Sequence, residues 1–186
     1  MPKIADIEDT PNPNAKKFIL KEPLTWGITR SYDNAGEAMD DLLAASIFDI
    51  EHVTNVFYVD HWLTVTQDGG ADWQQLLRRV ADRIRAAPAA DEQTARLTAA
   101  AATPISDLSP DDQQRIYMIN GLLDEQIRPY LQGDGGDLHV LALEGNRLTV
   151  HYQGACGSCP SSMSGTLVSI EHLLKTIEPD IEVVAV

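Results

Sequence analysis

The chain has 186 residues, of which 44% are hydrophobic and 23% charged, a composition typical of globular proteins rather than disordered ones. The formal net charge is −14 and no region is basic, which argues against nucleic acids and anionic membranes as partners. No apolar run approaches the roughly 18 residues of a membrane helix. The N-terminus lacks a secretory signal and is too acidic for a transit peptide, so we expect a cytoplasmic protein or one already processed.

Residues 1–86 are expected to form a small β-β-α-β-β-α domain. Alternating apolar positions indicate strands, and apolar residues at i, i+3, i+4 and i+7 indicate amphipathic helices. No thiol and no catalytic constellation lies in this region. The expected elements are a strand ending at Leu20, a strand over Leu24–Arg30, a helix capped by Asn34, a hairpin around Asp60-His61 and a helix capped by Asp72.

Residues 87–109 differ in composition from the segments on either side. They contain Pro88, Pro104 and an alanine run over 99–102, which predicts a linker with some helical tendency. The linker separates the first domain from residues 110–186.

Residues 110–186 are expected to form a second small domain with the order α-β-β-α-β. Ser109-Pro110 followed by two aspartates is a strong helix start, and Pro129 predicts that this helix ends near Arg128. The fold class is therefore α+β, with two small sandwich-like domains. The remaining expected elements are strands over Leu138–Leu143 and Arg147–Gln153, a helix with an apolar stripe from Met163 to Ile177, and a strand over Ile181–Val186.

The only two cysteines of the chain, Cys156 and Cys159, lie between the second of these strands and the last helix. Pro160 suits the first helical position, which puts Cys159 at or near the N-cap. The N–H groups and positive dipole end at that point favour a thiolate. Because the loop is rich in glycine and polar residues, we expect a metal or redox role for the pair, with neither sulfur in the hydrophobic core.

Two thiolates are half of the ligand set that an iron–sulfur cluster of either common type usually takes. Two chains meeting at their cysteine loops would supply four. Two alternatives stay open: a dithiol–disulfide oxidoreductase, and a zinc-stabilised interaction module that recruits two of His139, His151 and His172. The oxidoreductase usually has a βαβ context, and the histidines lack the spacing of a zinc finger.

Several motifs together resemble the NifU-like (Nfu) iron–sulfur cluster carriers. The C-terminal half has the family's order of helix, loop, hairpin, cysteine loop and helix. The N-terminal half is similar to the N-terminal domain of the same family. The motifs are Thr10-Pro11-Asn12-Pro13-Asn14, Asp72-Trp73, Arg128-Pro129, Asp134-Gly135-Gly136-Asp137 and Gly154-Ala155-Cys156-Gly157-Ser158-Cys159-Pro160-Ser161-Ser162.

The resemblance implies a non-enzymatic carrier with Cys156 and Cys159 as cluster ligands. A homodimer would hold one [4Fe–4S] cluster between its subunits, with [2Fe–2S] as the alternative. An upstream assembly scaffold would supply the cluster and apo iron–sulfur proteins would receive it. The N-terminal domain would contribute partner recognition or stability. We interpret Asp134-Gly135-Gly136-Asp137 as a tight polar turn in preference to a ligand group.

Overall fold

The computed structural model describes residues 1–88, 109–157 and 160–186, and the side chains of all of these except residues 160–164. The chain divides into two compact units, Met1–Ala102 and Thr103–Val186. Each unit combines helices with a sheet, which confirms the expected α+β class. Residues 89–108 of the predicted linker lie outside the described residues.

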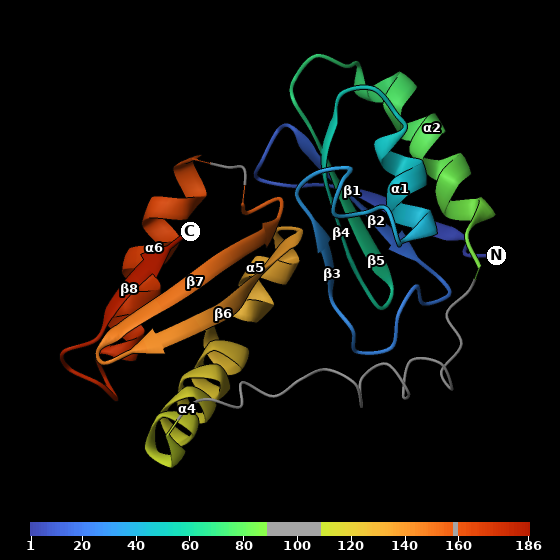
Figure 1. Ribbon diagram of the computed structural model, residues 1–186. Helices are drawn as coiled ribbons and strands as arrows, with labels where there is room; N and C mark the ends of the chain where they lie inside the picture. Colours follow the sequence, from blue (N-terminus) through green and yellow to red (C-terminus); the bar gives the residue numbers. More distant parts are fainter. Residues whose placement is uncertain (89–108, 158–159) are drawn as a thin grey trace. The chain divides into compact units, whose positions relative to one another are not determined.

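The first unit is a five-stranded antiparallel sheet with two helices against one face (Figure 1). Its strand order is β1-β2-β5-β4-β3, so the hairpin predicted around Asp60-His61 occupies part of the centre. The elements are β1 (Ile4–Asp9), β2 (Ala15–Leu20), β3 (Arg30–Tyr32), α1 (Leu42–Phe48), β4 (Val53–Val59), β5 (Trp62–Gln67) and α2 (Trp73–Ala86).

The core of this unit lies between the sheet and its two helices. Phe18 pairs with Leu63 across β2 and β5, and both side chains are buried toward the helices. From α2, Leu76, Val80 and Ile84 complete the contact, as the predicted stripe requires. Asp72 caps α2 by accepting a hydrogen bond from the Gln74 N–H at 2.9 Å.

Three features of the first unit differ from the expectation. β1 was not expected, because an exposed edge strand such as Ile4–Asp9 has no buried face to produce a clear alternation. The strand that was expected over Leu24–Arg30 is β3, and it covers Arg30–Tyr32 instead. Asn34 and Glu37 do exchange capping-type hydrogen bonds, but the helix begins at Leu42 with Asp41 as its N-cap.

The second unit packs one face of a three-stranded sheet against α4 and α6 (Figure 1). The strand order is β6-β7-β8, with an antiparallel β6–β7 hairpin and β8 parallel to β7. None of the helices in the described residues is both long and apolar enough to cross a membrane. The elements are α4 (Pro110–Gln126), α5 (Arg128–Gly133), β6 (Gly136–Glu144), β7 (Arg147–Gly154), α6 (Pro160–Leu174) and β8 (Glu182–Ala185).

The first helix of this unit begins as predicted. The Ser109 hydroxyl accepts a hydrogen bond from the Asp112 N–H at 3.1 Å. The helix ends at Gln126, two residues before the expected point, and Pro129 lies in the first turn of α5. Proline is tolerated there because N–H groups of a first turn have no intrahelical partner.

Candidate metal centre

The loop that carries Cys156 is anchored to the start of β6. β7 pairs with β6 as far as Gly154 opposite Gly136, and Gly154 then turns the chain with φ of 65°. The Ala155 N–H donates to the Gly135 carbonyl at 3.1 Å, and the Gly157 N–H donates to the Gly154 carbonyl at 3.2 Å. These bonds fix the backbone on both sides of Cys156.

Gly136 makes room for the sulfur of Cys156. A Cβ built on Gly136 would lie 2.7 Å from Cys156 Sγ and 2.5 Å from the Gln153 carbonyl oxygen. Real Cβ atoms do not approach other atoms this closely, so a residue with a Cβ would fit here only if the Gln153 backbone and Cys156 shifted. The second glycine of Asp134-Gly135-Gly136-Asp137 therefore acts on the cysteine loop, which sequence reasoning did not detect.

Cys156 is buried, with 4% of its surface exposed. It belongs to the hydrophobic cluster that includes Leu123, Tyr152 and Ile170. The expectation that neither sulfur lies in the core is therefore wrong for Cys156. The polar, glycine-rich sequence of the loop does not reveal the burial, because burial depends on the pairing of Gly154 with Gly136.

Cys159 lies outside the described residues. The last helix does begin at Pro160, the residue that the sequence places at the first helical position. Helix N-termini favour anions because their N–H groups lack intrahelical acceptors. The Cys-x-x-Cys segment therefore lies in the chain between the last residue of β7 and the first residue of α6.

Arg128 connects the parts of the unit that support this loop. Its Nε donates to the Leu138 carbonyl at 3.2 Å, and its Nη2 donates to Asn120 Oδ1 at 2.9 Å. Nη1 pairs with Asp124. One guanidinium thus joins α4, the start of α5 and β6, where the sequence indicated only a family motif.

Asp137 stabilises the turn that precedes β6. Its Oδ1 accepts from the Leu138 N–H at 2.7 Å, and its Oδ2 accepts from Gln132 at 3.3 Å. Burial raises the pKa of the Asp137 carboxyl, opposed by the hydrogen bond from Leu138. Gly135 has a φ of 84°, the left-handed backbone conformation that glycine adopts readily in tight turns. These contacts support the interpretation of the motif as a tight turn.

Tyr152 is a further residue that sequence reasoning missed. Its ring is buried in the same cluster as Cys156. Burial, together with the charge that Cys156 can carry, raises the pKa of Tyr152 to about 12. Its hydroxyl has no hydrogen-bond partner within the described part of the chain.

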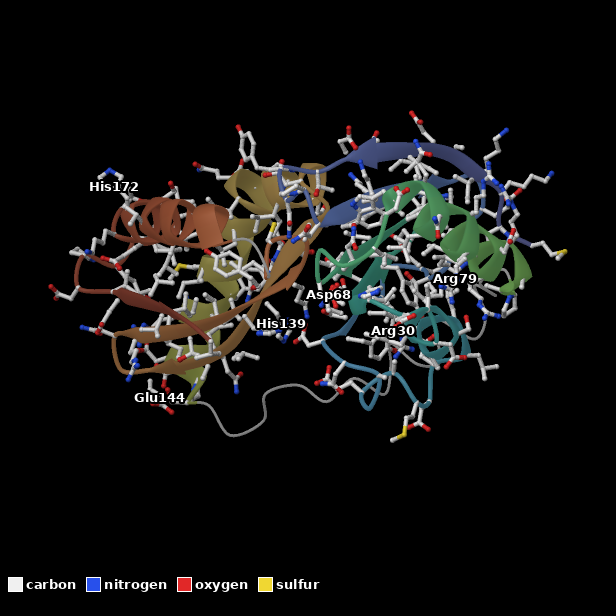
Figure 2. All side chains as sticks on the ribbon, turned by 90° about the horizontal axis from the view of Figure 1, so that it is seen from above. Arg30, Asp68, Arg79, His139, Glu144 and His172 are labelled. Atoms are coloured by element: carbon white, nitrogen blue, oxygen red, sulfur yellow. The ribbon has the colours of Figure 1, made fainter. Side chains whose placement is uncertain are left out.

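The three histidines proposed as alternative ligands do not gather at Cys156. His139 and His151 are partners across β6 and β7. Since side chains alternate along a strand, they project from the face opposite their buried neighbours Leu138 and Tyr152. His172 points outward from α6 (Figure 2). No group of three or more His, Cys, Asp or Glu residues among those described has metal-binding geometry.

Comparison with known proteins finds the same two-part organisation. A family model described as "Scaffold protein Nfu/NifU N terminal" matches residues 4–90, and one described as "NifU-like domain" matches residues 119–185. The human "NFU1 iron-sulfur cluster scaffold homolog, mitochondrial" is 33% identical over 181 residues, covering 94% of this chain and 68% of its own. The Drosophila sechellia protein of the same name is 32% identical over 176 residues, covering 94% and 62%.

These matches define a two-domain protein of the NifU-like class. The chain belongs to the Nfu iron–sulfur cluster scaffold family, as the sequence motifs predicted. It spans 62% of the length of the Drosophila sechellia relative.

The expectation of a cytoplasmic protein is contradicted by these comparisons. Both relatives are named mitochondrial. The inference rested on the composition of the first residues alone, and that composition is not sufficient to identify the compartment.

Proposed function

We propose that this protein is a non-catalytic iron–sulfur cluster scaffold and carrier, with the cluster as its cargo. Two copies would bind one [4Fe–4S] cluster through Cys156 and Cys159 of each and deliver it to apo iron–sulfur proteins. An upstream assembly scaffold would supply the cluster. Membership in a family whose members are named cluster scaffolds supports this role.

The observation that carries the proposal is the construction of the cysteine loop. The loop leaves β7 at Gly154 and leads into α6 at Pro160, and Gly136 leaves room for the sulfur of Cys156. Backbone N–H groups at a helix N-terminus stabilise negative charge, and thiolates are the ligands that iron–sulfur clusters require. The loop thus has the chemistry of a cluster ligand segment.

The number of thiols supports sharing between two copies. The chain has two cysteines, and four thiolates usually hold a [2Fe–2S] or a [4Fe–4S] cluster. A second copy would complete the set and leave few attachments per subunit, which suits release.

Residues 110–186 would form the cluster-binding domain, with residues 87–109 as the linker. The first domain, residues 1–86, would then contribute partner recognition or stability. The groups that bear on the cluster lie in the second unit: both cysteines, Gly136 and the Arg128 contacts.

Anaerobic reconstitution with iron and sulfide tests the proposal. The expected product is a brown dimer with one four-iron cluster per two chains, measured by iron and sulfide analysis with light scattering. Incubation with an apo form of a [4Fe–4S] enzyme should restore its activity. Cys156→Ala and Cys159→Ala should each prevent stable loading, whereas Ser169→Ala, on the exposed side of α6, should load normally.

A colourless monomer with reduced thiols would refute the proposal. Zinc in the purified protein with unfolding on chelation would favour the zinc module instead. Disulfide reductase turnover with a reversible Cys156–Cys159 disulfide would favour the oxidoreductase.

A further inference from the structure

The hydroxyl of Tyr152 lies in the hydrophobic core, where packing of the aromatic ring does not require it. The residue is 2% exposed, and its oxygen has no hydrogen-bond partner within residues 1–88, 109–157 and 165–186. Folded proteins leave few buried polar groups unpaired, because each costs about 1–3 kcal/mol. A phenylalanine would fill the same ring volume without that cost. The hydroxyl therefore needs a hydrogen-bond partner that is not among the described side chains.

The pairing of β6 with β7 places Tyr152 beside Cys156. Tyr152 lies opposite Leu138, and Gly154 lies opposite Gly136, so Tyr152 and Gly136 are diagonal neighbours on the same face. Side chains of diagonal neighbours are within reach when one is aromatic. Since Cys156 Sγ fills the space over Gly136, the ring and the sulfur occupy adjacent positions in one cluster.

We propose that the Tyr152 hydroxyl donates a hydrogen bond to Cys156 Sγ when that sulfur binds iron, and so acts as a positioning residue for the cluster. This inference rests on the proposed function. A neutral thiol is a weak acceptor, whereas a ligating thiolate carries negative charge and is a much stronger one. The thiol proton is released to solvent when the sulfur binds metal. The resulting thiolate sulfur is the acceptor for the Tyr152 hydroxyl.

A donor to a ligating sulfur has a measurable electrochemical effect. Hydrogen bonds to the sulfurs help to set the reduction potential of an iron–sulfur cluster. Reduction adds negative charge to the cluster, and a donor stabilises the more negative state. Removal of the hydroxyl should therefore shift the potential to a more negative value.

The experiment compares full-length wild-type protein, Tyr152→Phe and the control Tyr117→Phe after anaerobic reconstitution. Tyr117 is 81% exposed on α4 and loses the same hydroxyl without touching the core. We expect equal cluster content in all three. The potential, measured by redox titration, should be more negative in Tyr152→Phe alone. Urea unfolding of the apo proteins should show Tyr152→Phe to be at least as stable as wild type.

A second substitution separates hydrogen bonding from packing. Incorporation of 3-fluorotyrosine at position 152 keeps the shape but makes the hydroxyl a stronger donor, and it should shift the potential in the opposite direction. If both variants load fully and keep the wild-type potential, the inference is overturned while the proposed function stands. If wild-type protein takes up no cluster, the proposed function fails, and this inference fails with it.

Discussion

The sulfur of Cys156 occupies the space where Gly136 has no side chain. A Cβ at position 136 would lie 2.7 Å from that sulfur, so the turn before β6 and the cysteine loop form one packed unit. In the sequence these residues are separated by the whole β6–β7 hairpin.

Gly136→Ala should therefore damage both the fold and the site. The new methyl group would collide with Cys156 Sγ and the Gln153 carbonyl, and overpacking of this kind typically costs about 1–3 kcal/mol. Urea unfolding followed by circular dichroism should show that loss, and reconstitution should give less cluster. Gly133→Ala is the control, because nothing lies within 4 Å of a Cβ there. Equal stability of the two variants would contradict the packing argument.

Replacement of Cys156 should weaken the apo protein as well as cluster binding. Because the sulfur lies in the core, Cys156→Ser buries a hydroxyl that needs a partner, at a cost of about 1–3 kcal/mol. Cys156→Ala loses only some packing and should cost less. Thermal unfolding of the apo forms checks the order. A serine variant as stable as wild type would show that the loop keeps the side chain in water.

Arg115 should contribute to stability through a bidentate ion pair with Glu178. Its Nε and Nη2 donate to the two carboxylate oxygens at 2.9 and 2.6 Å, connecting α4 to the segment after α6. Lysine cannot reproduce this geometry, so Arg115→Lys should cost about 1–2 kcal/mol, within the range for hydrogen bonds to charged groups. The exposed pair Arg85–Asp82 provides the control, since Arg85→Lys should change stability by less than about 0.5 kcal/mol. A double-mutant cycle with Glu178→Gln gives the coupling energy directly.

The first unit should lose stability at high pH. Tyr32 and Tyr58 both donate to Asp41 Oδ2. Burial, followed by the bonds to Asp41, raises the pKa of Tyr32 to about 12 and that of Tyr58 further above its usual range. The unfolded chain releases these protons near pH 10, so the stabilisation is complete below about pH 10 and declines as pH rises through the folded-state values.

Tryptophan fluorescence during urea unfolding measures this decline, because Trp26, Trp62 and Trp73 all belong to the first unit. Tyr32→Phe should flatten the dependence above pH 10, whereas Tyr130→Phe, an exposed residue of the other unit, should leave it unchanged. A flat profile in wild-type protein would show that burial and the bonds to Asp41 do not raise the pKa values of these hydroxyls.

Local sequence patterns predicted many elements of the two units. Asp72 and Ser109 cap helices as expected, because capping depends on residues within one turn. The alternation around Asp60-His61 identified the central hairpin. Elements without a local signal were missed or misplaced: β1 is an exposed edge strand, and the capping pair Asn34–Glu37 precedes a turn.

Spacing and motif order along the chain are enough to identify the two-unit α+β organisation, the family and the Cys-x-x-Cys segment between the last hairpin and the last helix. The residues that surround the cysteine loop become apparent only in the folded chain. Strand register brings Gly136, Tyr152 and Cys156 together, and Arg128 joins two helices to β6 through its side chain. Such contacts join residues distant in sequence, so they arise only when β6 and β7 pair.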